Sequence, residues 1–87
     1  MQETRQARVR RLIYRSSYTG MKETDLLLGQ FAKLHLASLN DTELDQYEAL
    51  LEAGDPSIFA WVRGDEAVPD EFDTRVLALI SDFNKTL

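Results

Sequence analysis

The amino-acid sequence predicts an all-α protein, a small five-helix bundle built as one domain over residues 1–87. Apolar residues recur at steps of three and four along nearly the whole chain, which is the spacing of an amphipathic helix. No stretch shows the strict alternation of apolar and polar residues that indicates a strand. Residues that cap or break helices divide the chain into segments with short connections, as in a helical bundle.

The first helix is expected from about residue 4 to residue 17. Its apolar stripe consists of Val9, Leu12 and Ile13. Arginines occupy the neighbouring faces, so that this helix is strongly basic. Residues 18–20 interrupt it, because Gly20 suits the backbone of a tight turn.

The second helix is expected from about residue 21 to residue 38. Its apolar residues surround most of the circumference: Leu26, Leu27, Leu28, Phe31, Leu34 and Leu36. This distribution predicts a central, well-buried helix, with Leu27, Phe31 and Leu34 on one line. His35 is expected on the helix surface or at the boundary of the core, because too few groups surround it for a catalytic base.

A capping box predicts the start of the third helix, because Asn40 is followed three residues later by Glu43. The apolar residues of this helix are Leu44, Tyr47, Leu50 and Leu51. Gly54 ends it. The acidic residues of the region are expected to cap helix ends or to face solvent: Asp41, Glu43, Asp45 and Glu48.

Asp55 is then expected to cap a short fourth helix, with Pro56 at its first position. The apolar residues of that helix are Ile58, Phe59, Trp61 and Val62. Packing explains this crowding better than ligand stacking, because so short a helix needs tertiary contacts to form. Gly64 closes the helix.

The last helix is expected from about Asp70 to Lys85, after a loop over residues 64–72 in which Pro69 places the restart. Its apolar residues are Phe72, Val76, Leu79, Ile80 and Phe83. Acidic residues in its first turn and Lys85 in its last turn complement the helix dipole.

Charge is divided unevenly along the chain, whose formal net charge is −5. Residues 1–33 hold seven basic and three acidic residues, and residues 34–87 hold three basic and twelve acidic ones. A chain that is acidic overall is a poor fit to nucleic acid. The basic first helix is therefore interpreted as facing another protein, and a merely solvated basic face is the alternative.

Several classes of protein are excluded by composition. No apolar run reaches the length of a membrane span, no secretory signal is evident, and cysteine is absent. One histidine and no nucleotide-binding, zinc-protease or calcium-loop pattern leave no candidate catalytic, cofactor-binding or metal-binding residue. The Arg-rich opening has the composition of a mitochondrial presequence, but it runs directly into the first patterned element and is interpreted as a basic helix.

One segment suggests a function: RRLIYRSSYTGMKETDLLLGQFA, residues 10–32. A glycine at a helix junction is followed at once by charged residues, and loops with such irregularity often carry function. The purely structural alternative is that Gly20 turns the chain and Glu23 complements the free N–H groups of the next helix.

The chain resembles the succinate dehydrogenase assembly factors that promote covalent attachment of FAD to the flavoprotein subunit, called SdhE in bacteria. The resemblance spans RRLIYRS, GMKETDLLLGQFA, LND.EL..YE.LLE, DPSIFAWV and VLALISDF. The family signature is Arg-Gly-x-x-Glu, which Gly20 and Glu23 match, whereas Thr19 stands at the arginine position. Arg15 or Lys22 is then expected to supply the positive charge that threonine lacks.

The resemblance implies a five-helix bundle that docks on the flavoprotein subunit near its FAD. The implied contact residues are Arg11, Arg15, Thr19, Gly20, Met21, Lys22 and Glu23. Docking would hold a histidine of that subunit against the flavin 8α-methyl carbon, so that this chain acts as a chaperone without a catalytic residue or a tightly bound cofactor of its own. Gly20 would matter because a side chain there would obstruct the partner.

Further expectations follow from the resemblance. The free protein is expected to be a monomer in the bacterial cytoplasm, rather than in a mitochondrial matrix, with fumarate reductase as an open second client. Two other classes of function stay open, namely an antitoxin-like or general adaptor protein and a small enzyme or direct FAD carrier. The last is disfavoured because the sequence has no phosphate-binding loop.

Overall fold

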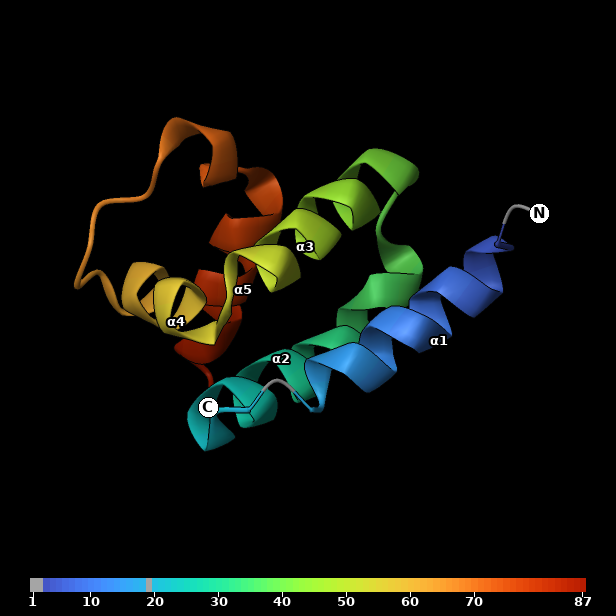
Figure 1. Ribbon diagram of the computed structural model, residues 1–87, viewed down its shortest axis with the longest axis horizontal. Helices are drawn as coiled ribbons and strands as arrows, with labels where there is room; N and C mark the ends of the chain where they lie inside the picture. The colour runs from blue at the N-terminus through green and yellow to red at the C-terminus, as the bar shows by residue number, and fades with distance from the viewer. Residues whose placement is uncertain (1–2, 19) are drawn as a thin grey trace.

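The computed structural model describes residues 3–18 and 20–87, and within these ranges it is all α, without a strand. Figure 1 shows how the helices are arranged. Their bounds are α1 (Arg5–Ser16), α2 (Lys22–His35), α3 (Asp41–Ala53), α4 (Asp55–Arg63) and α5 (Arg75–Asn84), with short 3-10 helices η1 (Leu36–Ser38) and η2 (Asp70–Phe72). The prediction of an all-α five-helix bundle is confirmed.

The α2 helix joins the two halves of the bundle. On one side it packs against α1, which also contacts η1, and on the other side it packs against α4 and α5. The α3 helix contacts α4 and α5 and lies across the bundle from α2 in Figure 1. One continuous core results, formed by Leu12, Leu27, Leu28, Phe31, Ala32, Leu36, Leu39, Leu44, Tyr47, Leu50, Leu51, Ile58, Val76, Leu77 and Ile80.

Side-chain caps determine where α1 and α3 begin. The hydroxyl of Thr4 accepts a hydrogen bond of 3.1 Å from the Ala7 amide at the start of α1. The Asn40 side chain accepts from the Glu43 amide at 2.8 Å, and the Glu43 carboxylate accepts from the Asn40 amide at 3.0 Å. The predicted capping box is therefore confirmed.

A buried polar contact joins α1 to α3 inside the core. The Ser16 hydroxyl donates to the carbonyl oxygen of Leu12 at 2.6 Å and is hydrogen-bonded to the Tyr47 hydroxyl. Because serine has only one hydroxyl proton, Tyr47 must be the donor in the second bond. Burial raises the pKa of Tyr47, so its phenol keeps the proton that this bond needs.

Two leucines of α2 depart from the prediction of a helix buried on all sides. The side chains of Leu26 and Leu34 are 56% and 68% exposed. The neighbouring helices cover only the arc of α2 that carries Thr24, Leu27 and Phe31, together with Leu28 and Ala32. Leu34 lies just beyond the edge of this arc, and Leu26 lies outside it.

The start of the last helix also differs from the prediction. The acidic residues after Pro69 form the separate helix η2, and α5 begins at Arg75 with no acidic residue in its first turn. Thr74 caps it, because its hydroxyl accepts from the Leu77 amide at 3.3 Å. Both Pro69 and Thr74 are helix-start signals, and the last helix begins after Thr74, whereas Pro69 precedes only η2.

Phe31, Trp61, Phe72, Phe83 and His35 lie as predicted. The ring of Trp61 stacks on Phe72 with centroids 4.9 Å apart and packs against the core, whereas the ring of Phe59 lies under the Arg63 guanidinium, whose carbon is 5.2 Å from the ring centroid. His35 is exposed on the surface of α2, where its ring contacts Phe31 and Phe83.

Candidate functional site

The junction between α1 and α2, here called the corner (residues 20–23), has a backbone that requires glycine. Gly20 has φ of +110°, a conformation that side-chain-bearing residues rarely adopt. A Cβ atom added at Gly20 would lie 3.8 Å from Asp55 Oδ2, which is an ordinary contact distance. The chain itself therefore needs glycine here for its backbone angle and not for lack of space.

Asp55 does not play its predicted part as a cap of α4. The α4 helix begins at Asp55 itself, Gly54 is its N-cap residue, and no side chain caps it. The Asp55 carboxylate instead accepts a hydrogen bond of 3.1 Å from the Met21 amide. Met21 is the N-cap residue of α2 and has no capping side chain of its own, so Asp55 satisfies a free amide of another helix.

A cavity of about 390 Å³ opens beside the corner. It is lined by Arg15, Tyr18, Gly20, Met21, Leu51, Gly54, Asp55 and Pro56. The lining comes from the end of α1, the corner, the end of α3 and the start of α4. Of these residues, the sequence predicted Arg15, Gly20 and Met21 for the site, but not Tyr18 or the α3–α4 junction, although the Gly-Asp-Pro run of the junction is the same kind of signal as Gly20.

The charged residues predicted for the site divide into two groups. Arg15 is half-buried at the cavity, and Lys22 and Glu23 are exposed on the first turn of α2. Within the described ranges, none of these three side chains has a hydrogen-bond or ion-pair partner. Lys22 borders a second hollow of about 380 Å³, which is lined by residues of α2 and by Ser17 just after α1. Thr19, also predicted for the site, lies outside the residues that the structure describes.

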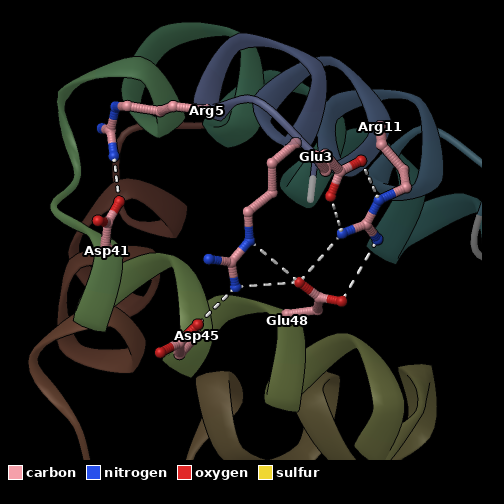
Figure 2. Close-up of polar contacts among 7 residues, drawn as sticks. Glu3, Arg5, Arg11, Asp41, Asp45 and Glu48 are labelled. Carbon is pink, nitrogen blue, oxygen red and sulfur yellow. Dashed lines mark hydrogen bonds and ion pairs between the residues drawn. The ribbon is translucent and has the colours of Figure 1, made fainter. Parts of the chain in front are cut away.

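Arg11 belongs to the second group, because it is engaged within the chain (Figure 2). Its guanidinium pairs with Glu3 at 2.9 Å and with Glu48 of α3 at 3.3 Å. The structure therefore places Arg11 in a network between α1 and α3, and not among the residues that line the cavity.

Two further arginines of α1 pair with α3, Arg8 within the same network and Arg5 in a separate ion pair that Figure 2 shows. Arg8 pairs with Asp45 at 2.6 Å and with Glu48 at 3.1 Å. Arg5 pairs with Asp41 at 2.9 Å and also donates to the Leu39 carbonyl. The acidic residues of α3 are thus ion-pair partners and not only caps and solvated groups. The uneven charge of the two parts of the sequence is the signal that points to this pairing.

The network makes stability depend on pH through Glu48. Hydrogen bonds from Arg11, together with Arg8, hold the pKa of the Glu48 carboxyl below its ordinary value of 4.5. A carboxylate with a lowered pKa in the folded state stabilises the fold above about pH 4.5, and this contribution is lost as the pH falls through the lowered value.

We expect Glu48→Gln to lower the free energy of unfolding by about 1 kcal/mol at pH 7 and low salt, since the side chain is partly exposed and screened. The difference from wild type should shrink as the pH falls from about 4.5 through the lowered pKa of Glu48. Urea unfolding between pH 3 and pH 7 measures it, with Glu52→Gln in the same helix as the control. An equal loss at both ends of the pH range would contradict the role of the ion pairs.

The protein family described as "Flavinator of succinate dehydrogenase" matches residues 10–84, a range that contains the corner and the helices α2 to α5. The chain belongs to this family. The resemblance to the succinate dehydrogenase assembly factors, seen in the sequence, is therefore confirmed.

Three relatives illustrate the similarity, each named "Succinate dehydrogenase assembly factor 2, mitochondrial". The protein of Dictyostelium discoideum is 45% identical over 71 residues, which cover 82% of this chain and 50% of the relative. That of Meyerozyma guilliermondii is 42% identical, covering 90% and 61%, and that of Candida glabrata is 42% identical, covering 86% and 52%. The chain thus spans between half and about three fifths of the length of these curated relatives.

These relatives correct the expected location. The prediction of a bacterial cytoplasmic protein is wrong, because each of these relatives is named as a mitochondrial protein. The residues that carry the resemblance determine the fold and the corner, and neither depends on the compartment.

No helix within the described residues is long and apolar enough to cross a membrane. Nor do those residues include a group of three or more His, Cys, Asp or Glu side chains placed to hold a metal ion.

Proposed function

We propose that this chain is an assembly factor that binds the flavoprotein subunit of succinate dehydrogenase and promotes covalent attachment of FAD to it. The observation that carries the proposal is the family match, which covers the corner and nearly the whole bundle. The names of the relatives support the same role. In this proposal the flavoprotein holds the FAD and performs the chemistry, and this chain acts as a chaperone.

The corner is the proposed docking surface, with Gly20 and Met21 at its centre. The side chains of Arg15, Lys22 and Glu23 surround it without partners in the described structure, so binding another protein breaks no ion pair of theirs. Arg11 would have to share its guanidinium with Glu3 and Glu48, which makes it a weaker contributor. Thr19 stays a proposed contact on the strength of its place in the family motif alone.

Arg15 is the proposed substitute for the arginine that the motif lacks at position 19. A guanidinium presents a planar set of donors that fits a carboxylate in a two-bond geometry, which a threonine hydroxyl does not match. The side chain of Arg15 is half-buried at the cavity, so part of the cost of ordering it is met before the partner arrives. A carboxylate of the flavoprotein is the group that it would bind.

Docking promotes the covalent bond by shifting a population. A flavoprotein subunit in which the attaching histidine only rarely lies against the flavin reacts slowly. A partner that binds the reactive arrangement more tightly than the others raises its population in proportion to the difference in affinity. In this proposal the chain needs only a surface that is complementary to the reactive arrangement of the flavoprotein, and it supplies no chemical group to the reaction.

The test uses an apo flavoprotein subunit of succinate dehydrogenase, FAD and the purified chain. Covalent flavin is followed by in-gel fluorescence after denaturation, and binding is measured by calorimetry. The wild-type chain should increase the rate of labelling, and Arg15→Ala should weaken binding by about tenfold. Arg10→Ala is the matched control, since Arg10 is an exposed arginine of the same helix that does not line the cavity.

The outcomes separate the possible functions. A wild-type chain that binds the subunit without changing the labelling rate would indicate a general adaptor. Tight, stoichiometric binding of FAD by the chain alone would indicate a flavin carrier. Equal affinities of Arg15→Ala and wild type would show that Arg15 does not replace the motif arginine, and would leave the assembly function standing.

A further inference from the structure

Asp55 connects two helix starts that are 34 residues apart in the sequence. It is the first residue of α4, and its carboxylate accepts the Met21 amide at the start of α2. The hydrogen bond is charge-assisted, which makes it stronger than a bond between neutral groups. A carboxylate at this place is also near the positive ends of two helix dipoles. The bond therefore fixes the start of α2 to the α3–α4 junction.

Both sides of this link are built on unusual backbone. Gly20 precedes Met21 with φ of +110°, and Gly54 precedes Asp55 with φ of +100°. Each glycine turns the chain sharply at a helix start, and the turn directs Met21 and Asp55 toward each other. Such conformations persist where the surrounding contacts determine them. The hydrogen bond from the Met21 amide to the Asp55 carboxylate is a contact that holds the corner in its conformation.

The link also shapes the cavity. Gly20, Met21, Gly54 and Asp55 all line it, as does Arg15 from α1. Movement of the corner away from α4 would change the distance between Arg15 and the exposed residues Lys22 and Glu23. A docking surface made of separate charged groups depends on such distances.

We infer that Asp55 is a positioning residue, which holds the Gly20–Met21 corner in the form that the flavoprotein subunit recognises. This inference rests on the function proposed above and adds to it a residue outside the Arg-Gly-x-x-Glu motif. Asp55 acts through the Met21 amide and contacts neither the flavin nor the reacting histidine. Replacing Asp55 is therefore expected to change the affinity for the flavoprotein subunit.

Two substitutions separate this role from a direct contact with the partner. Asp55→Asn keeps an oxygen that accepts a hydrogen bond and removes the charge, whereas Asp55→Ala removes both. Asp55→Ala should weaken binding to the apo flavoprotein subunit by about tenfold, and should speed hydrogen exchange of the Met21 amide by a similar factor. Asp55→Asn should stay within about threefold of wild type in both measurements.

The control is Asp65→Ala, which removes an exposed acidic residue beyond α4 whose ion-pair partner is Arg63. It should change neither the affinity nor the exchange of the Met21 amide. Thermal unfolding of each variant shows that the bundle is folded. If Asp55→Ala does not fold, Asp55→Asn is compared with Asp65→Ala instead. The inference requires the two variants to bind the flavoprotein subunit with similar affinity, and a much weaker Asp55→Asn would contradict it.

Three results would overturn the inference. If the wild-type chain binds the flavoprotein subunit and Asp55→Ala binds it with the same affinity, the inference is wrong and the proposed function stands. Equal weakening by both variants, with normal exchange of the Met21 amide in Asp55→Asn, would make Asp55 a direct contact of the partner. A wild-type chain that does not bind the flavoprotein would overturn the proposed function together with this inference.

Discussion

Gly20→Ala is expected to slow covalent flavin attachment by at least about tenfold while the bundle stays folded. A side chain at φ of +110° strains the backbone by roughly 1–3 kcal/mol. The corner is exposed and relieves this strain most easily by changing its backbone angles. Such a change moves the Met21 amide away from Asp55 and disrupts the proposed docking surface. The labelling rate and the affinity for the flavoprotein subunit measure the effect.

Gly64→Ala is the matched control for this prediction. Gly64 also has positive φ, +79°, and a Cβ there would meet no atom within 4 Å. The same substitution therefore imposes a backbone cost of the same kind at the end of α4, outside the residues that line the cavity. Gly64→Ala should retain the activity of wild type. Equal activities of the two variants would show that the conformation of Gly20 is not needed for recognition.

Phe31→Ala is expected to have the largest effect on stability, about 3–5 kcal/mol. Phe31 is buried in α2, with its ring near Tyr47 at 5.9 Å and Phe83 at 5.8 Å between centroids. Removing the ring leaves a cavity where α2 meets the rest of the core. Domains of this size are stable by only a small number of kcal/mol, so most of the protein's stability would be lost. Thermal unfolding should shift downward by more than about 10 °C.

Leu34→Ala tests whether burial determines this loss. Both residues belong to α2 and were predicted on one apolar line, but the Leu34 side chain is 68% exposed. Its replacement should change the free energy of unfolding by no more than about 0.5 kcal/mol. A large loss with Leu34→Ala would mean that α2 is covered on that face in solution.

Local signals in the sequence predicted most of the fold. The Asn40–Glu43 capping box and the glycines at the ends of α3 and α4 lie within a few residues of the boundaries that they determine. Competing local signals produced the error at α5, where Pro69 and Thr74 both suggest a helix start. Hydrophobic spacing identified the buried arc of α2 but not its width, because the width depends on which helices cover it.

The candidate site was predicted less completely, since its contacts join distant parts of the chain. Gly20 and the charged residues after it were visible in the sequence because they are adjacent. The bond between Met21 and Asp55 spans 34 residues, and no local pattern indicates it. The pairing of Arg8 and Arg11 with Glu48 likewise depends on how α1 and α3 are placed by the helices between them.

The cavity beside the corner has a consequence for when the protein becomes competent to bind. Its walls come from Arg15, Tyr18 and the Gly20–Met21 corner on one side, and from Leu51 and residues 54–56 on the other, so they meet only where α3 and α4 are packed. A partial fold that contains α1 and α2 alone presents the corner without the part of the surface that α3 and α4 supply. Recognition of the complete surface favours fully folded molecules, and binding in turn stabilises them by mass action. In the function proposed above, the flavoprotein subunit would therefore bind the completely folded chain in preference to a partly folded one.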